Sequence, residues 1–121
     1  GGIVAGQEVA RLLGARAIFA ERVNDQMTLR RGFELKPGER GIAVEDVVTT
    51  GGSVKEVIKL AQSLQAEVVA AAFIVDRSGG KAEFDVPKFS VFQMEVITYQ
   101  PESCPLCEKG IEIEKPGSRK N

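Results

Sequence analysis

The spacing of apolar positions near the start of the chain is helical. Between residues 3 and 13 the apolar side chains fall largely on one face, and Gly14 follows them. Because glycine readily adopts the left-handed conformation that ends many helices, we predict a helix over residues 3–13. The next apolar run, ARAIFA (residues 15–20), is short and nearly continuous, which is typical of a strand covered on both faces.

Further along, strand-like and helical patterns alternate. Residues 41–44, 67–76 and 89–98 are mainly apolar runs of strand length. Residues 53–65 carry a single apolar stripe at helical spacing, formed by Val54, Val57, Ile58, Ala61 and Leu64. Strand, helix and strand in this order form a parallel βαβ unit. The predicted fold class is therefore α/β, with a parallel sheet and flanking helices.

The remaining segments are polar. Residues 22–32 lack a clean period and predict an exposed loop or a loose ribbon, and KPGE (residues 36–39) predicts a turn. Residues 101–121 are rich in proline, glycine and charge and predict a loosely ordered tail. The chain is thus expected to form one domain over residues 1–100, followed by a C-terminal tail over residues 101–121.

Composition excludes several function classes. The 121 residues suffice for one core, and 16 basic against 17 acidic residues give no overall field that would recruit nucleic acid or a membrane. No apolar run has the length of a bilayer span, so a cytoplasmic location is the default expectation. The chain has no histidine, the commonest general base and metal ligand. It opens on Gly1 and Gly2 without methionine, and we expect a fragment or a processed chain.

One stretch carries candidate chemistry. Glu45 and Asp46 come directly after a predicted strand, and the loop Thr49–Ser53 leads into the predicted helix. Backbone N–H groups and hydroxyls at a helix N-terminus bind phosphate, and glycines let the backbone approach closely. Carboxylates a few ångströms away accept hydrogen bonds from hydroxyl groups. A ribose 5-phosphate satisfies both requirements.

The common phosphate-binding loops fit this stretch less well. A Walker loop needs a lysine before its serine or threonine, and a dinucleotide loop needs the spacing G-x-G-x-x-G; both features are absent. The purely structural alternative is an acidic strand end followed by an ordinary turn and a serine N-cap. It requires the strand, the acidic pair, the hydroxyl-glycine loop and the amphipathic helix to coincide by chance.

The stretch IAVEDVVTTGGSVKEVI resembles the phosphoribosyl-diphosphate (PRPP) binding motif of type I phosphoribosyltransferases. The flanks RAIFAERVNDQMTLRRGFELKPGERG, VDRSGG and CPLCEKGIEIEKPGSR resemble the bacterial and archaeal orotate-specific members. The resemblance covers nearly the whole chain. It implies a Rossmann-like core and a reaction in which orotate displaces pyrophosphate from PRPP, with Mg²⁺ as cofactor, to give orotidine 5′-monophosphate for UMP synthesis.

The resemblance also assigns roles to residues. It implies that PRPP is bound by Glu45, Asp46, Val47, Val48, Thr49, Thr50, Gly51, Gly52 and Ser53. Glu45 and Asp46 would act in catalysis near the ribose hydroxyls and Mg²⁺, with no direct protein ligand to the metal expected beyond them. Thr49 and Arg77 match positions that contact orotate, and a guanidinium pairs well with a carboxylate.

Residues 22–31 match a mobile loop that closes over the neighbouring subunit's site and supplies cations to the diphosphate. The resemblance therefore implies a homodimer with shared active sites. The better-known loop has lysines and a histidine, whereas here the basic residues are Arg22, Arg30 and Arg31. Arg22 is taken as the catalytic candidate, with all three left open as diphosphate ligands. Gly1 and Gly2 fall at the family's pyrophosphate loop, so a segment that helps to enclose orotate is expected to be missing.

Cys104 and Cys107 have the C-x-x-C spacing of a zinc half-site or a redox pair. Zinc needs four ligands, and the sequence has neither a second cysteine pair nor a histidine. A redox pair should open a helix, whereas this one is expected in a polar tail. We therefore expect two reduced thiols, packed against the sheet edge.

Two alternative functions remain open. A purine-type phosphoribosyltransferase would share the PRPP motif, because base choice depends largely on residues outside it. A non-catalytic, PRPP-sensing regulatory protein would keep the fold as a ligand sensor. The absence of a basic, aromatic face argues against nucleic-acid binding, and the two retained carboxylates favour catalysis.

Overall fold

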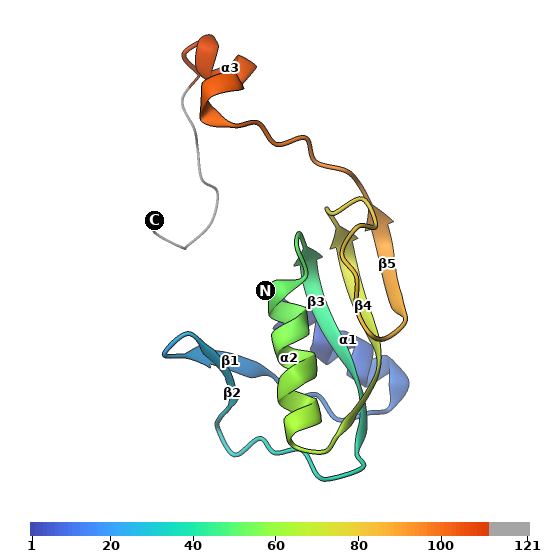
Figure 1. The fold of residues 1–121 in the computed structure, drawn as a ribbon. Coiled ribbons are helices and arrows are strands. Elements are labelled where there is room, and N and C mark those ends of the chain that lie inside the picture. Colours follow the sequence, from blue (N-terminus) through green and yellow to red (C-terminus); the bar gives the residue numbers. More distant parts are fainter. Residues whose placement is uncertain (112–121) are drawn as a thin grey trace.

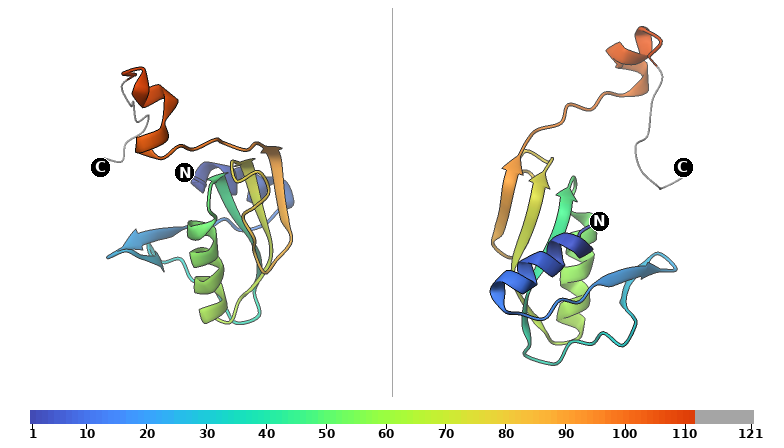
Figure 2. Two further views of the ribbon diagram at one scale, coloured as in Figure 1. Left: turned by 45° about the horizontal axis from the view of Figure 1, so that its top comes forward. Right: turned by 180° about the vertical axis from the view of Figure 1, so that it is seen from behind.

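The computed structural model describes residues 1–111 and has three layers (Figure 1). Its middle layer is a parallel sheet in the order β3 (Arg40–Val48), β4 (Glu67–Asp76) and β5 (Lys88–Gln93). Helix α1 (Ile3–Leu13) lies on one face and α2 (Gly52–Ser63) on the other, as the opposite views show (Figure 1; Figure 2). The α/β class and the parallel β3–α2–β4 unit are confirmed.

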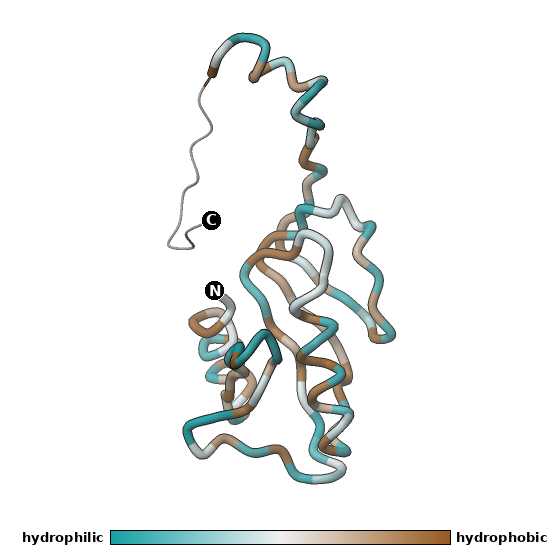
Figure 3. Tube along the Cα trace, turned by 60° about the vertical axis from the view of Figure 1, so that its left-hand side comes forward, coloured by the Kyte–Doolittle hydropathy of each residue, from teal (hydrophilic) through white to brown (hydrophobic). Residues whose placement is uncertain are grey.

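The core lies between α2 and the sheet. Val54 and Ile58 are four residues apart on α2 and pack with Ala71 and Phe73 of β4. Ala71 is completely buried, and its small side chain lets the helix approach the sheet closely. Burying one valine or isoleucine contributes about 1.5–3 kcal/mol. Hydrophobic and hydrophilic residues alternate along both long helices, as expected of helices with one buried face (Figure 3).

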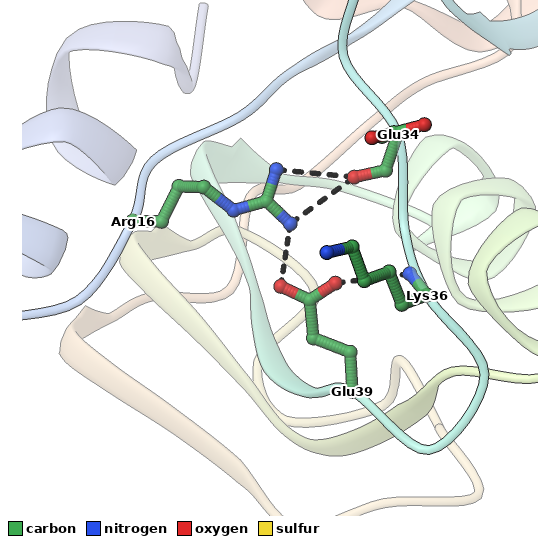
Figure 4. A network of polar contacts seen from close by, with 4 residues as sticks. All are labelled: Arg16, Glu34, Lys36 and Glu39. Carbon is green, nitrogen blue, oxygen red and sulfur yellow. Dashed lines mark hydrogen bonds and ion pairs between the residues drawn. The ribbon is translucent and has the colours of Figure 1, made fainter.

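The strand predicted over residues 15–20 was wrong. In the described residues the segment 15–19 is extended but pairs with no strand, and a strand forms only where its backbone groups find partners. Side chains hold it instead (Figure 4). The Arg16 guanidinium donates two hydrogen bonds of 3.1 Å to the Glu34 carbonyl and one of 2.5 Å to the Glu39 carboxylate.

Residues 20–29 form an antiparallel ribbon of β1 (Ala20–Val23) and β2 (Gln26–Leu29). This confirms the ribbon that was one of the two expectations for residues 22–32. The turn residues Asn24 and Asp25 have φ angles of 48° and 62°, as the tight hairpins that match strand twist require. The ribbon projects sideways from the body beside α2 (Figure 2).

The predicted turn over residues 36–39 is confirmed by a 3.0 Å hydrogen bond from the Glu39 N–H to the Lys36 carbonyl. The last strand is shorter than the predicted 89–98. It ends at Gln93: the Met94 N–H makes a last bond to the Asp76 carbonyl, and beyond it only an isolated antiparallel bridge joins Glu95 to Ser78. After that bridge the chain leaves the sheet.

The tail is more regular than expected. A 3₁₀ turn, η1 (Pro101–Ser103), and a single helical turn, α3 (Pro105–Glu108), follow the extended segment. Both stand away from the sheet (Figure 1; Figure 2). The rest of the predicted tail, residues 112–121, lies outside the described residues. Within residues 1–111, no helix combines the length and apolar character needed to cross a bilayer.

Candidate functional site

The acidic pair lies inside β3 rather than after it. The sequence predicted a strand over residues 41–44, but β3 runs on to Val48. The prediction was wrong because Val47 and Val48 continue the pairing with β4, opposite Val75 and Asp76. Glu45 and Asp46 therefore lie in the last four residues of β3, which is the end of a parallel strand where ligands bind in folds of this class.

The pKa values of the two carboxylates shift in opposite directions. Burial, together with a hydrogen bond to Asp46, raises the pKa of Glu45. The same hydrogen bond from the Glu45 side chain lowers the pKa of Asp46, and the Val47 N–H donates to Asp46 at 2.8 Å. The pair is thus arranged so that Asp46 holds the negative charge more readily than Glu45.

The glycines that open the chain lie against this pair. A Cβ atom added to Gly1 would fall 2.1 Å from an Asp46 carboxylate oxygen. One added to Gly2 would fall 2.8 Å from the Glu45 Cα and from its carboxylate oxygen. A side chain at Gly2 would collide with the backbone of β3, and one at Gly1 would displace the Asp46 carboxylate. The N-terminus of α1, whose N-cap residue is Gly2, therefore faces the acidic pair directly.

The loop Thr49–Ser53, which we call the phosphate-type loop, closes the other side of the site. Gly51 has a φ of 80° and caps α2 without a side chain, so the first backbone N–H groups of the helix remain available to an anion. Beneath it lies Phe84, whose ring would be only 2.8 Å from a Cβ at Gly51. Thr49 and Thr50 are exposed beside the loop, and Ser53 is half-buried.

An open pocket of about 540 Å³ continues from this loop. Its lining comes from three segments of the chain: Thr49 and Thr50; Arg77, Ser78, Lys81 and Ala82; and Glu95 to Thr98. Arg77 is exposed, and among the arginines of residues 1–111 it is the one whose side chain forms no ion pair. The structure thus brings Arg77 together with Thr49 and Thr50, whereas Glu45 and Asp46 lie against Gly1 and Gly2 and do not line this pocket.

The ribbon arginines are held elsewhere. Arg22 pairs with Glu56 of α2 at 2.7 Å, one helical turn beyond Ser53. Arg31 forms a two-pronged pair with Glu21, at 2.7 and 3.1 Å, and Arg30 lies 3.9 Å from the same carboxylate. The Arg31 hydrogen bonds lower the pKa of Glu21. In this conformation none of the three arginines lines the pocket.

The cysteine pair differs from its expected setting. Cys104 caps α3 and accepts a 3.4 Å hydrogen bond from the Cys107 N–H, so the pair does open a short helix. The expected packing against the sheet edge is wrong, because α3 stands apart from the sheet (Figure 1). Both thiols are free. The part of the chain that the structure describes contains no cluster of three or more histidine, cysteine, aspartate or glutamate side chains suited to a metal.

Sequence reasoning missed the residues that support the site. The first group is Asp76 with Ser78, which donates to it, and Lys88, which donates to the carbonyls of Gly80 and Ala82 in the same loop; the second is Glu56, which pairs with Arg22. An aspartate followed two residues later by a serine is a known turn pattern, so the letters DRS in VDRSGG carried a usable signal for the first group. Nothing in the spacing pointed to Glu56.

Comparison with known proteins identifies a family. The family model described as "Phosphoribosyl transferase domain" matches residues 1–106. Curated relatives called "Orotate phosphoribosyltransferase" include those of Caldanaerobacter subterraneus subsp. tengcongensis, 58% identical over 99% of this chain, and Thermotoga maritima, 57% identical over 98%. The chain spans 63% and 64% of these relatives' length.

Solved structures share the fold. An adenine phosphoribosyltransferase from Thermoanaerobacter pseudethanolicus aligns over 77% of this chain and 64% of its own, with a TM-score of 0.60 and 18% identity. At that identity the likeness concerns the fold alone. An orotate phosphoribosyltransferase from Aeropyrum pernix aligns over 72% of this chain and 52% of its own, with a TM-score of 0.56 and 26% identity.

Proposed function

Because the chain belongs to the phosphoribosyl transferase domain family, we propose that it carries the site of an orotate phosphoribosyltransferase. In the proposed reaction, orotate displaces pyrophosphate from PRPP and forms orotidine 5′-monophosphate, a precursor of UMP. The observation that carries the proposal is that Arg77 shares a pocket with Thr49 and Thr50, which belong to the loop that follows the acidic pair on β3 and leads into α2. Relatives of that name at 51–59% identity support the choice of base.

PRPP fits the site in one orientation. Its 5-phosphate binds the free N–H groups at the start of α2, in the loop that contains Gly51. Its ribose hydroxyls donate to Asp46 and Glu45. The diphosphate then lies toward the N-terminus of α1, where Gly1 and Gly2 leave room beside the acidic pair. Both helix N-termini place partial positive charge near phosphate groups.

The chemistry needs little proton transfer by the protein. As the bond from the ribose to the diphosphate breaks, positive charge builds on the sugar and negative charge on the leaving group. The ionised Asp46 carboxylate stabilises the sugar, and the α1 N-terminus stabilises the diphosphate. Binding both substrates along one sheet edge supplies the orientation. A site without histidine can perform these tasks.

The residues present also fit a magnesium ion. Mg²⁺ is usually held by one or two carboxylates, several waters and substrate phosphates, and Glu45 and Asp46 supply two carboxylates beside the proposed diphosphate position. The ion would neutralise charge on the leaving diphosphate.

Orotate would enter the pocket beside Arg77. Its carboxylate pairs with the guanidinium, which forms no ion pair within the described part of the chain and is free to make two parallel hydrogen bonds. Thr49 lines the same pocket. A purine has no carboxylate to match Arg77.

The proposal includes a cytoplasmic location. It also includes a homodimer in which the ribbon of residues 20–29 acts at the active site of the neighbouring subunit. The ribbon projects away from its own sheet, which suits action on another subunit (Figure 2). Arg22, Arg30 and Arg31 would leave their carboxylate partners to reach the diphosphate of that subunit.

An assay of pyrophosphate release tests the proposal. The chain is incubated with PRPP, Mg²⁺ and, separately, orotate, adenine or hypoxanthine. We expect pyrophosphate release in the reaction with orotate and none in the reactions with adenine or hypoxanthine. Release with a purine but not orotate would establish the purine-type alternative. PRPP binding without release for any base would favour the PRPP-sensing alternative.

A further inference from the structure

Asp76, at the end of β4, is almost completely buried, with 1% of its surface exposed. It is the one polar or charged residue so deeply buried within residues 1–111. A buried carboxylate is costly unless hydrogen bonds compensate for the lost water. Asp76 accepts two such bonds from Ser78, one from its N–H at 2.8 Å and one from its hydroxyl at 2.6 Å.

Ser78 extends this group through the loop that follows β4. Its hydroxyl donates to Asp76 and also accepts from the Ala82 N–H at 2.9 Å, so it closes the loop of residues 78–82. From the other side, the Lys88 ammonium donates to the carbonyls of Gly80 and Ala82 at 2.6 and 2.5 Å. Burial acts to raise the pKa of Asp76, but the Ser78 hydrogen bonds and the Lys88 charge lower it overall.

The loop that Asp76 organises touches both halves of the site. The Arg77 N–H donates to the carbonyl of Val48, the residue before Thr49, at 2.8 Å. This bond ties the backbone of Arg77 to the end of β3, and both Arg77 and Thr49 line the pocket. Farther along, Ala82 and Phe84 lie beneath Gly51 of the phosphate-type loop, at 3.5 and 2.8 Å from the position of a Cβ there.

We infer that Asp76 and Ser78 are positioning residues, which fix the loop of residues 77–82 so that Arg77 faces the base pocket. Asp76 is buried, and although Ser78 lines the pocket, its hydroxyl already donates to Asp76 and accepts from the Ala82 N–H. The inference rests on the proposed function for the identity of the base.

Two substitutions at one position test the inference. Ser78→Ala removes both hydroxyl bonds, whereas Ser78→Thr keeps a hydroxyl and serves as the conservative rescue. Ser63→Ala is the matched control, because it removes an exposed serine hydroxyl that bonds only the Leu60 carbonyl on α2. Each variant is checked for thermal unfolding. Amide hydrogen exchange of residues 77–82 and calorimetric binding of orotate and ribose 5-phosphate are then measured.

We expect Ser78→Ala to speed exchange of the Ala82 amide at least about tenfold, because that N–H loses its acceptor. Orotate affinity should fall about tenfold, the scale of one lost hydrogen bond to a charged group, while ribose 5-phosphate affinity changes less than about threefold. Ser78→Thr should restore both values, and Ser63→Ala should leave them at the wild-type level.

Unchanged exchange or unchanged orotate affinity in Ser78→Ala would overturn the inference, as would equal losses for both ligands. If the wild-type chain binds ribose 5-phosphate but not orotate, the proposal that orotate is the substrate base is wrong. The exchange rates of Ser78→Ala and Ser78→Thr then decide the positioning role by themselves. If Ser78→Ala does not fold, Lys88→Met takes its place, because it removes the donors to the Gly80 and Ala82 carbonyls.

Discussion

Among the arginines of residues 1–111, Arg77 is set apart by the lack of a carboxylate partner, and it lines the pocket proposed for the base. Arg77→Ala should lower orotate affinity at least about tenfold, because a charged hydrogen-bonded pair is lost, and ribose 5-phosphate affinity less than about twofold. Calorimetry measures both. Arg40→Ala, at the start of β3 and paired with Glu67 on the surface, is the control and should bind both ligands normally. Equal losses for the two ligands would indicate a general structural defect.

Glu45 is a second residue whose setting makes a prediction, through pH. Because burial raises its pKa, protonated Glu45 favours folding, and this contribution is lost as pH rises through the folded-state pKa. At pH 7 its ionisation opposes folding. Glu45→Gln cannot ionise and keeps a donor for Asp46, so we expect the free energy of unfolding at pH 7 to rise by up to about 1 kcal/mol.

Denaturant titrations at pH 7 and pH 4 measure this effect. The gain should shrink at pH 4, where the wild-type carboxyl is increasingly protonated. Glu83→Gln, which changes an exposed carboxylate, should have little effect at either pH. A gain that is larger at pH 4 than at pH 7 would contradict the assigned direction. A stabilised variant with weaker PRPP binding would show that the site trades stability for function.

The sequence could predict site residues that are neighbours along the chain, but not contacts between residues that are far apart in the sequence. Glu45, Asp46 and the loop through Ser53 form one contiguous stretch, so the sequence could group them as one candidate site, and the structure places Arg77 in a pocket with Thr49 and Thr50 of this stretch. The contact of Gly1 with Asp46, and of Phe84 with Gly51, joins residues more than thirty positions apart. The periodicity of the sequence does not predict such contacts, because they depend on the path of the chain through the fold and on side-chain packing.

At the scale of elements, helices could be predicted from local sequence, whereas strands depend on partners elsewhere in the chain. The spacing of apolar residues and Gly14 set α1, and β4 was predicted with its observed bounds. A helix satisfies its own backbone, so local pattern suffices. Residues 15–20 have a strand's composition, yet a strand exists only beside another strand, and in the described residues the segment 15–19 has none. The local sequence cannot specify that neighbour.

The ribbon is joined to α2 by the exposed ion pair of Arg22 with Glu56. Glu56→Gln should change the free energy of unfolding by less than about 1 kcal/mol, because exposed pairs contribute little. It should nevertheless speed amide exchange in β2, because the ribbon loses a tether to the body. Glu67→Gln, which removes the exposed pair with Arg40, is the control and should leave β2 unchanged. Unaltered exchange in Glu56→Gln would mean that backbone pairing alone holds the ribbon.

At the scale of the whole molecule, one face of the sheet is incompletely covered. On the α1 side, Ile74, Phe89 and Val91 have 48%, 64% and 85% of their surface exposed. The outer side of α1 adds Val4 and Leu12, both about three-quarters exposed at 75% and 74%. Exposed apolar side chains gathered on one face favour an interaction site there. It supports the proposed homodimer, in which a ribbon that projects from one body can reach the next.

Mixing variant subunits tests whether the ribbon acts across that dimer. Asp46→Asn damages the pocket and Arg22→Ala damages the ribbon, so each variant alone should be inactive. If a ribbon serves its neighbour's site, a mixed dimer keeps one site with an intact pocket and an intact ribbon. Random reassortment makes half the dimers mixed, so activity should return to about a quarter of the wild-type value, measured as pyrophosphate release. Native mass spectrometry confirms that mixed dimers form. Mixed dimers without activity would place the action of Arg22 within its own subunit and contradict the shared site.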